Sequence, residues 1–105
     1  MFGKKSTDTK MNTLIGAGAE LSGDFTLDGS ARIDGKIGGN VTVTGNLILG
    51  AGSVVMGDVQ AASVLIGGEV TGDINAPEKA ELTASAKVLG DIVTKVIVID
   101  EHAVF

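Results

Sequence analysis

The residues best suited to chemistry are carboxylates that recur directly after a glycine. With one asparagine, they form the series Asp24, Asn40, Asp58, Asp73 and Asp91. Stacked carboxylates could bind cations, but calcium takes six to eight oxygen ligands and each of these segments supplies one carboxylate. Asp and Asn beside Gly also hydrogen-bond local backbone groups in tight turns. We therefore interpret the series as turn stabilisers and expect no metal site.

Catalysis would have to depend on His102, the single histidine of the chain. A Ser-His-Asp relay would need it, and nothing in its neighbourhood marks such a site. A β-helical carbonic anhydrase needs three His ligands for zinc, and the left-handed hexapeptide acyltransferases have an even sixfold sub-period that is missing here. We predict that the protein is not an enzyme, that it has no cofactor, and that His102 lies on the outer surface.

The turn residues belong to a repeat that runs from Thr13 to the end of the sequence with a period of 16 to 18 residues. Its strongest aliphatic series is Ile15, Ile33, Leu49, Ile66, Leu82 and Ile99, with a companion two residues earlier at Ala31, Leu47, Val64, Ala80 and Ile97. A second series is Leu21, Ile37, Val55, Val70 and Val88. A third, always four residues later, is Phe25, Val41, Val59, Ile74 and Ile92. Such self-similarity is typical of solenoids.

The short apolar segments of each repeat alternate, as in Val41-Thr42-Val43, which is strand periodicity and not helical periodicity. We expect an all-β fold: a single-stranded, right-handed parallel β-helix of triangular cross-section, with about six windings of roughly 17 residues. Each strand would pair with its counterpart one winding on, and the aliphatic series would stack inside the coil. Glycine suits the corners because it reaches positive φ without steric cost, and Pro77 also falls at a corner.

Composition narrows the possible environments and partners. The net charge is −5, and residues 13–105 carry five basic and twelve acidic side chains. An acidic body argues against binding nucleic acid through phosphates. No apolar run reaches a membrane-spanning length, no secretory signal is present, and the absence of Cys fits a reducing compartment. We expect a cytoplasmic protein that is peripheral at the inner face of the cell membrane.

The ends of the expected coil are the surfaces most prone to association, because a terminal winding exposes apolar residues and unpaired backbone groups. We predict that copies polymerise end to end through Ile97, Ile99, Val104 and Phe105 at the C-terminal end and Ile15, Leu21 and Phe25 at the N-terminal end. The alternative is a β-solenoid that does not polymerise and binds a protein partner through its faces.

Residues 1–12 are polar, basic and without period, and we expect them to form a disordered tail before a β-helix domain at residues 13–105. An ordinary mobile terminus is one interpretation of this segment. The other is a peripheral membrane anchor, with Met1 and Phe2 inserted among lipids and Lys4 and Lys5 near anionic headgroups.

Taken together, residues 13–105 resemble the bactofilins, a family of bacterial polymer-forming cytoskeletal proteins. The resemblance is carried by Thr13-Leu14-Ile15-Gly16, the recurrent Gly-Asp-Val/Ile, Leu49-Gly50-Ala51-Gly52-Ser53-Val54 and Val96-Ile97-Val98-Ile99-Asp100. It implies nucleotide-independent filaments without polarity, built from contacts between like ends, and a scaffolding role. Family members often have a short N-terminal membrane-targeting peptide, which Met1-Phe2-Gly3-Lys4-Lys5 resembles.

Overall fold

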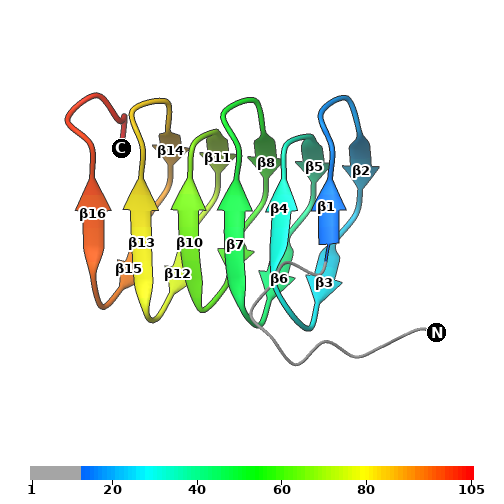
Figure 1. The fold of residues 1–105 in the computed structure, drawn as a ribbon, viewed down its shortest axis with the longest axis horizontal. Helices are drawn as coiled ribbons and strands as arrows, with labels where there is room; N and C mark the ends of the chain where they lie inside the picture. Colours follow the sequence, from blue (N-terminus) through cyan, green and yellow to red (C-terminus); the bar gives the residue numbers. More distant parts are fainter. Residues whose placement is uncertain (1–12) are drawn as a thin grey trace.

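The computed structural model describes residues 13–105, which form sixteen short strands and no helix (Figure 1). Sheet A has six strands: β1 (Thr13–Ile15), β4 (Ala31–Ile33), β7 (Asn46–Leu49), β10 (Ser63–Ile66), β13 (Lys79–Leu82) and β16 (Ile97–Ile99). Sheet B has five: β2 (Glu20–Ser22), β5 (Lys36–Gly38), β8 (Val54–Met56), β11 (Glu69–Thr71) and β14 (Lys87–Leu89). Sheet C has five: β3 (Phe25–Leu27), β6 (Val41–Val43), β9 (Val59–Gln60), β12 (Ile74–Ala76) and β15 (Ile92–Thr94).

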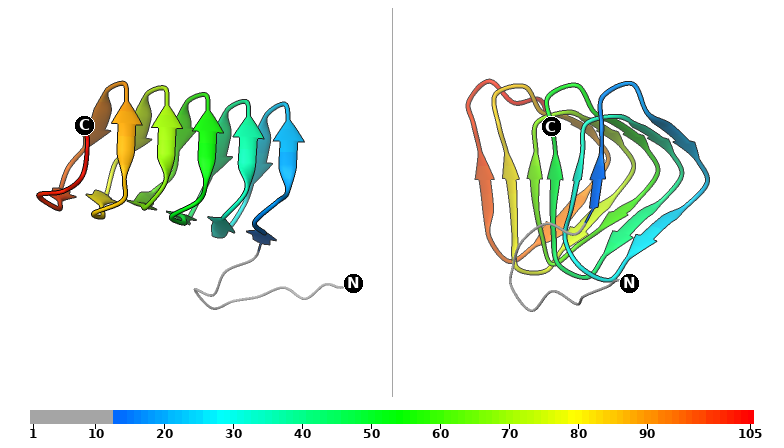
Figure 2. Two further views of the ribbon diagram at one scale, coloured as in Figure 1. Left: turned by 90° about the horizontal axis from the view of Figure 1, so that it is seen from above. Right: turned by 45° about the vertical axis from the view of Figure 1, so that its right-hand side comes forward.

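The chain visits sheets A, B and C in turn, so the three sheets form the sides of a coil with a three-sided outline (Figure 2). Five windings contribute a strand to every sheet, and a sixth adds β16 and a single parallel bridge from Val104 to Lys87. All strand pairs are parallel, and the windings advance in a right-handed sense (Figure 1). The predicted parallel β-helix is therefore confirmed.

The aliphatic series of the repeat are in register from winding to winding. In sheet A, Ile33 pairs with Leu49 and Leu49 with Ile66. Sheets B and C continue the other two series, as in the pair Val55 and Val70 and the pair Val59 and Ile74. In the middle windings these side chains are fully buried. The pattern missed one further buried column on sheet C, formed by Val43, Ala61 and Ala76.

Glycine at the corner between sheets B and C has a second role beyond the one predicted. Gly23, Gly72 and Gly90 do have positive φ, but Gly39 and Gly57 do not. A Cβ on Gly57 would collide with the carbonyl oxygen of Gly39, and the same conflict recurs at Gly39, Gly72 and Gly90 with the preceding winding. The prediction of positive φ is therefore confirmed at Gly23, Gly72 and Gly90 and wrong at Gly39 and Gly57. The sequence analysis missed the second requirement for glycine, the close contact of successive backbones.

Candidate polymerisation interface

At the C-terminal end, apolar residues that would be buried inside the coil are open to solvent. Ile97 and Ile99 are each 44% exposed, whereas their partners one winding earlier, Ala80 and Leu82, are at most 1% exposed. Phe105 is 57% exposed. No described winding covers these side chains, so they form an exposed apolar surface at this end of residues 13–105.

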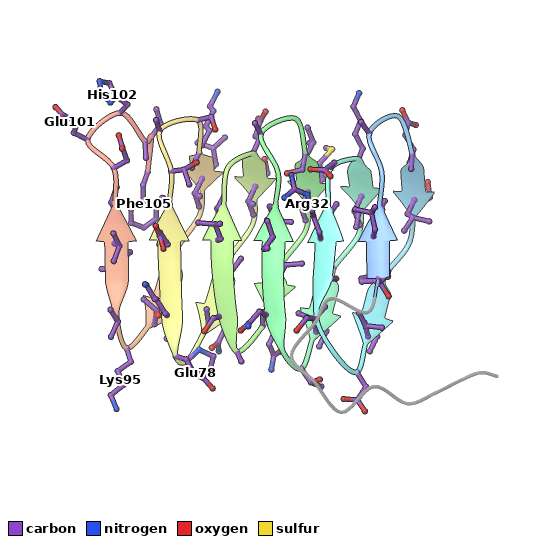
Figure 3. All side chains as sticks on the ribbon, viewed as in Figure 1. Arg32, Glu78, Lys95, Glu101, His102 and Phe105 are labelled. Carbon is purple, nitrogen blue, oxygen red and sulfur yellow. The ribbon has the colours of Figure 1, made fainter. Side chains whose placement is uncertain are left out.

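Phe105 continues one of the inward columns. Val104 donates its N–H to the Ala86 carbonyl at 3.0 Å and accepts the N–H of Val88 at 2.9 Å. Because Val104 pairs with Lys87, Phe105 follows directly above Val88, in the series Leu21, Ile37, Val55, Val70 and Val88. Figure 3 shows Phe105 at the C-terminal end of the coil.

Val104 differs from the other three predicted interface residues at this end. Its partner Lys87 is an exposed position of β14, and inward and outward side chains alternate along a strand. Val104 therefore lies on the outer face of sheet B, while Phe105 belongs to the interior column. The structure brings Ile97, Ile99 and Phe105 together over one cross-section and sets Val104 at its rim.

The N-terminal end is also apolar, but its residues are better covered. Ile15 and Phe25 are half-buried against the core, and Leu21 is 41% exposed. Leu27, which the sequence analysis did not single out, is half-buried on the same cross-section and pairs with Val43. The alternation Phe25-Thr26-Leu27 is the signal that could have identified it. The edge strands β1, β2 and β3 leave one side of their backbones without a strand partner among residues 13–105.

The Gly-Asp series forms a hydrogen-bonded ladder along one corner of the coil. The side-chain oxygen Oδ1 of each member accepts the backbone N–H of the next: Asp24 from Asn40 at 2.9 Å, Asn40 from Asp58 at 2.9 Å, Asp58 from Asp73 at 2.9 Å and Asp73 from Asp91 at 3.0 Å. Each side chain thus ties its corner to the next winding. The series stabilises the corners as predicted, but its bonds reach the backbone of the next winding, whereas the prediction placed them within the local turn. Within residues 13–105, no group of three or more His, Asp or Glu is placed to hold a metal ion.

His102 lies on the outer surface, as predicted, and projects from the last corner (Figure 3). Asp100 accepts the backbone N–H of His102 at 2.8 Å, and His102 Nδ1 lies 3.0 Å from the same oxygen. These two hydrogen bonds, the backbone one first, lower the pKa of Asp100. Asp100 and His102, two residues apart, thus stabilise the turn at the last corner.

Met1, Phe2, Lys4 and Lys5, the predicted membrane-binding residues, lie outside the described residues, as does the whole predicted tail at residues 1–12. Residues 13–105 include no helix that is long and apolar enough to cross a membrane.

Comparison with known proteins places this geometry in a family. The sequence profile described as "Bactofilin: Polymer-forming cytoskeletal" matches residues 13–105. Among curated proteins, bactofilin BacP of Myxococcus xanthus (strain DK1622) is 34% identical over 90 residues, and bactofilin BacO of the same strain is 32% identical over 102 residues. The matches cover 85% and 97% of this chain. The chain spans only 38% of the length of BacP but 81% of that of BacO.

Two solved structures are similar, both of a bactofilin from Thermus thermophilus. A cryo-EM reconstruction of its double helical filaments has a TM-score of 0.86 and 38% identity, covering 90% of this chain and 93% of that one. A crystal structure of a phenylalanine-to-arginine mutant has a TM-score of 0.79 and 37% identity, covering 84% of this chain and 98% of that one.

Proposed function

Because the chain belongs to the bactofilin family of polymer-forming cytoskeletal proteins, we propose that it assembles end to end into filaments without polarity and without nucleotide. The observation that carries the proposal is the exposed C-terminal cross-section of Ile97, Ile99 and Phe105. The filaments of the similar Thermus protein support it. We assign the chain a structural role and no catalytic one.

The energetics of an end contact favour association. Edge strands that meet would form a row of ladder hydrogen bonds at a net value of about 0.5–1.5 kcal/mol each. Each large apolar side chain that becomes fully buried adds roughly 1.5–3 kcal/mol. Several such bonds and side chains together can exceed an association cost estimated at about 4–15 kcal/mol. Both ends are apolar, so contacts between like ends, C-terminal with C-terminal and N-terminal with N-terminal, are compatible with the surfaces present.

The test is sedimentation of the pure protein at micromolar concentration without nucleotide. We expect wild-type protein to pellet and Phe105→Arg to remain as short soluble species, since the substitution places a charge in an apolar contact. Circular dichroism should still show β structure in the variant. The matched control is Val93→Arg, which changes an exposed valine on the outer face of β15, near the same end, and should pellet like wild type.

Sedimentation of Phe105→Arg to the same extent as wild type would contradict the end contact. A wild-type protein that stays monomeric would instead favour the alternative function, a β-solenoid that binds a protein partner through its faces.

We further propose that the filaments scaffold other proteins at the inner face of the cell membrane, in the cytoplasm, and that residues 1–12 attach them to it. The support is the sequence of this tail, in which Met1 and Phe2 lie beside Lys4 and Lys5. One basic residue near an anionic surface contributes about 1 kcal/mol, so a single tail binds weakly. A filament that carries many tails binds by avidity.

Binding to anionic liposomes, measured by flotation, tests the anchor. Deletion of residues 1–12 should abolish liposome binding and leave filaments intact, and Phe2→Ala should weaken binding because it removes the largest inserted side chain. Filaments and liposomes must be separated by flotation, since filaments pellet alone. Liposome binding that survives the deletion would refute the anchor while leaving the polymerisation proposal unaffected.

A further inference from the structure

The outer face of sheet A is more apolar than the outer face of sheet C. Its central outward column, one residue from each strand, is Leu14, Arg32, Ile48, Leu65, Glu81 and Val98. The matching column of sheet C is Thr26, Thr42, Gln60, Asn75 and Val93. Four of the six sheet A positions are aliphatic, against one of the five on sheet C. We call this sheet A column the lateral stripe.

Two opposite charges interrupt the lateral stripe at equal distances from its middle. Arg32 on β4 and Glu81 on β13 each lie one strand outside the central pair Ile48 and Leu65. Arg32 donates from Nε to Asp34 at 3.0 Å, which uses one of its five N–H donors. Glu81 has a longer ion pair, 3.6 Å from Lys79 Nζ. Both charged side chains remain more than two-fifths exposed, and Figure 3 shows Arg32 on this face.

Reading the lateral stripe in either direction gives the same order of apolar and charged positions with the charges exchanged. A two-fold axis parallel to the strands, between β7 and β10, would place β4 opposite β13 of a second copy and β7 opposite β10. Arg32 would then face Glu81, Ile48 would face Leu65, and Leu14 would face Val98. Packed sheets lie about 10 Å apart, a separation that a long Arg side chain and a Glu side chain span together.

From this self-complementary order, we propose that the lateral stripe pairs two protofilaments of this chain side by side in antiparallel orientation. This inference rests on the proposed end-to-end filaments. Parallel pairing in register would instead put Arg32 against Arg32 and Glu81 against Glu81, and like charges directly opposite are unfavourable. Protofilaments built from like-end contacts have no polarity, so each copy can find a reversed partner. The double helical filaments of the Thermus protein support the choice of a second copy as the occupant.

The test uses negative-stain electron microscopy of filaments formed separately by wild type, Arg32→Glu and Glu81→Arg. We expect paired filaments from wild type and single protofilaments from either variant, because each variant brings like charges together across the two-fold axis. The double variant with both substitutions should pair again. Mixing preformed filaments of the two single variants should also restore pairs, since the reversed charges of one then complement those of the other.

Glu69→Arg is the matched control, because it reverses an acidic residue in the middle of sheet B and should leave pairing unchanged. Pairing that survives both single variants, or that the double variant and the mixture fail to restore, would overturn the inference. Wild-type protofilaments that stay single would overturn it without affecting end-to-end assembly. Pairing that appears only after deletion of residues 1–12 would indicate that the tail occupies this face, and it would also overturn the inference. The absence of any filament would overturn the proposed function and this inference together.

Discussion

Gly57 shows why the corner between sheets B and C requires glycine. The corner is tied by the ladder of Asp and Asn side chains, which holds each backbone N–H one winding above the side chain that accepts it. That spacing leaves no room for a side chain on the glycine beside it, because its Cα rests on the carbonyl of the preceding glycine. Gly and Asp therefore recur together for one reason, the close stacking of windings.

Gly57→Ala should lower the free energy of unfolding by about 1–3 kcal/mol, the usual cost of forcing atoms into a packed site. Its φ is not in the left-handed region, so the loss comes from contact with Gly39 and not from backbone conformation. Urea denaturation, at a concentration below that of filament formation, measures the change.

Gly52→Ala is the control for this substitution, since a Cβ there meets nothing within 4 Å and its φ is ordinary. It should be neutral or slightly stabilising, because alanine restricts the unfolded chain. Equal destabilisation by the two substitutions would show that the corner does not depend on close backbone stacking.

The strands are the elements that the sequence predicted best, because the repeat supplies several copies of the same alternation of apolar and polar residues. The series through Leu49, Val55 and Val59 predicted both the side of the strand that is buried and its partner one winding on. The buried column of Val43, Ala61 and Ala76 escaped because alanine gives a weak apolar signal. The placement of Val104 on an outer face escaped because it depends on the register of a single bridge to Lys87.

An aliphatic residue in a middle strand should stabilise mainly the fold, whereas one in a terminal strand should stabilise mainly the contact between copies. Leu49→Ala, in the fully buried middle of sheet A, should cost about 2–5 kcal/mol of unfolding free energy. Ile99→Ala, in the same column but half-exposed, should cost clearly less and should raise the protein concentration needed for assembly. Urea denaturation and a sedimentation series measure the two effects, and an unchanged assembly threshold for Ile99→Ala would argue against its role at the interface.

Residues 13–105 form a coil in which no described winding covers either end and whose sheets have exposed edges. Its aliphatic filling allows one winding to cover the next, and the same geometry allows one copy to cover another. The repeat alone predicted this architecture, whereas association through its ends stays a prediction. The sequence could not predict which outer face carries a symmetric order of charges, because that order becomes apparent only when the strands of sheet A lie side by side.

Electron microscopy of the pure protein without nucleotide is the decisive test of end-to-end assembly. We expect filaments in which β-layers about 4.8 Å apart continue across the boundary between subunits, with neighbouring subunits related by two-fold axes at both ends. We also expect Phe105→Arg to shorten these filaments to small species. A wild-type protein that remains monomeric, or filaments in which subunits touch only through their faces, would contradict end-to-end assembly.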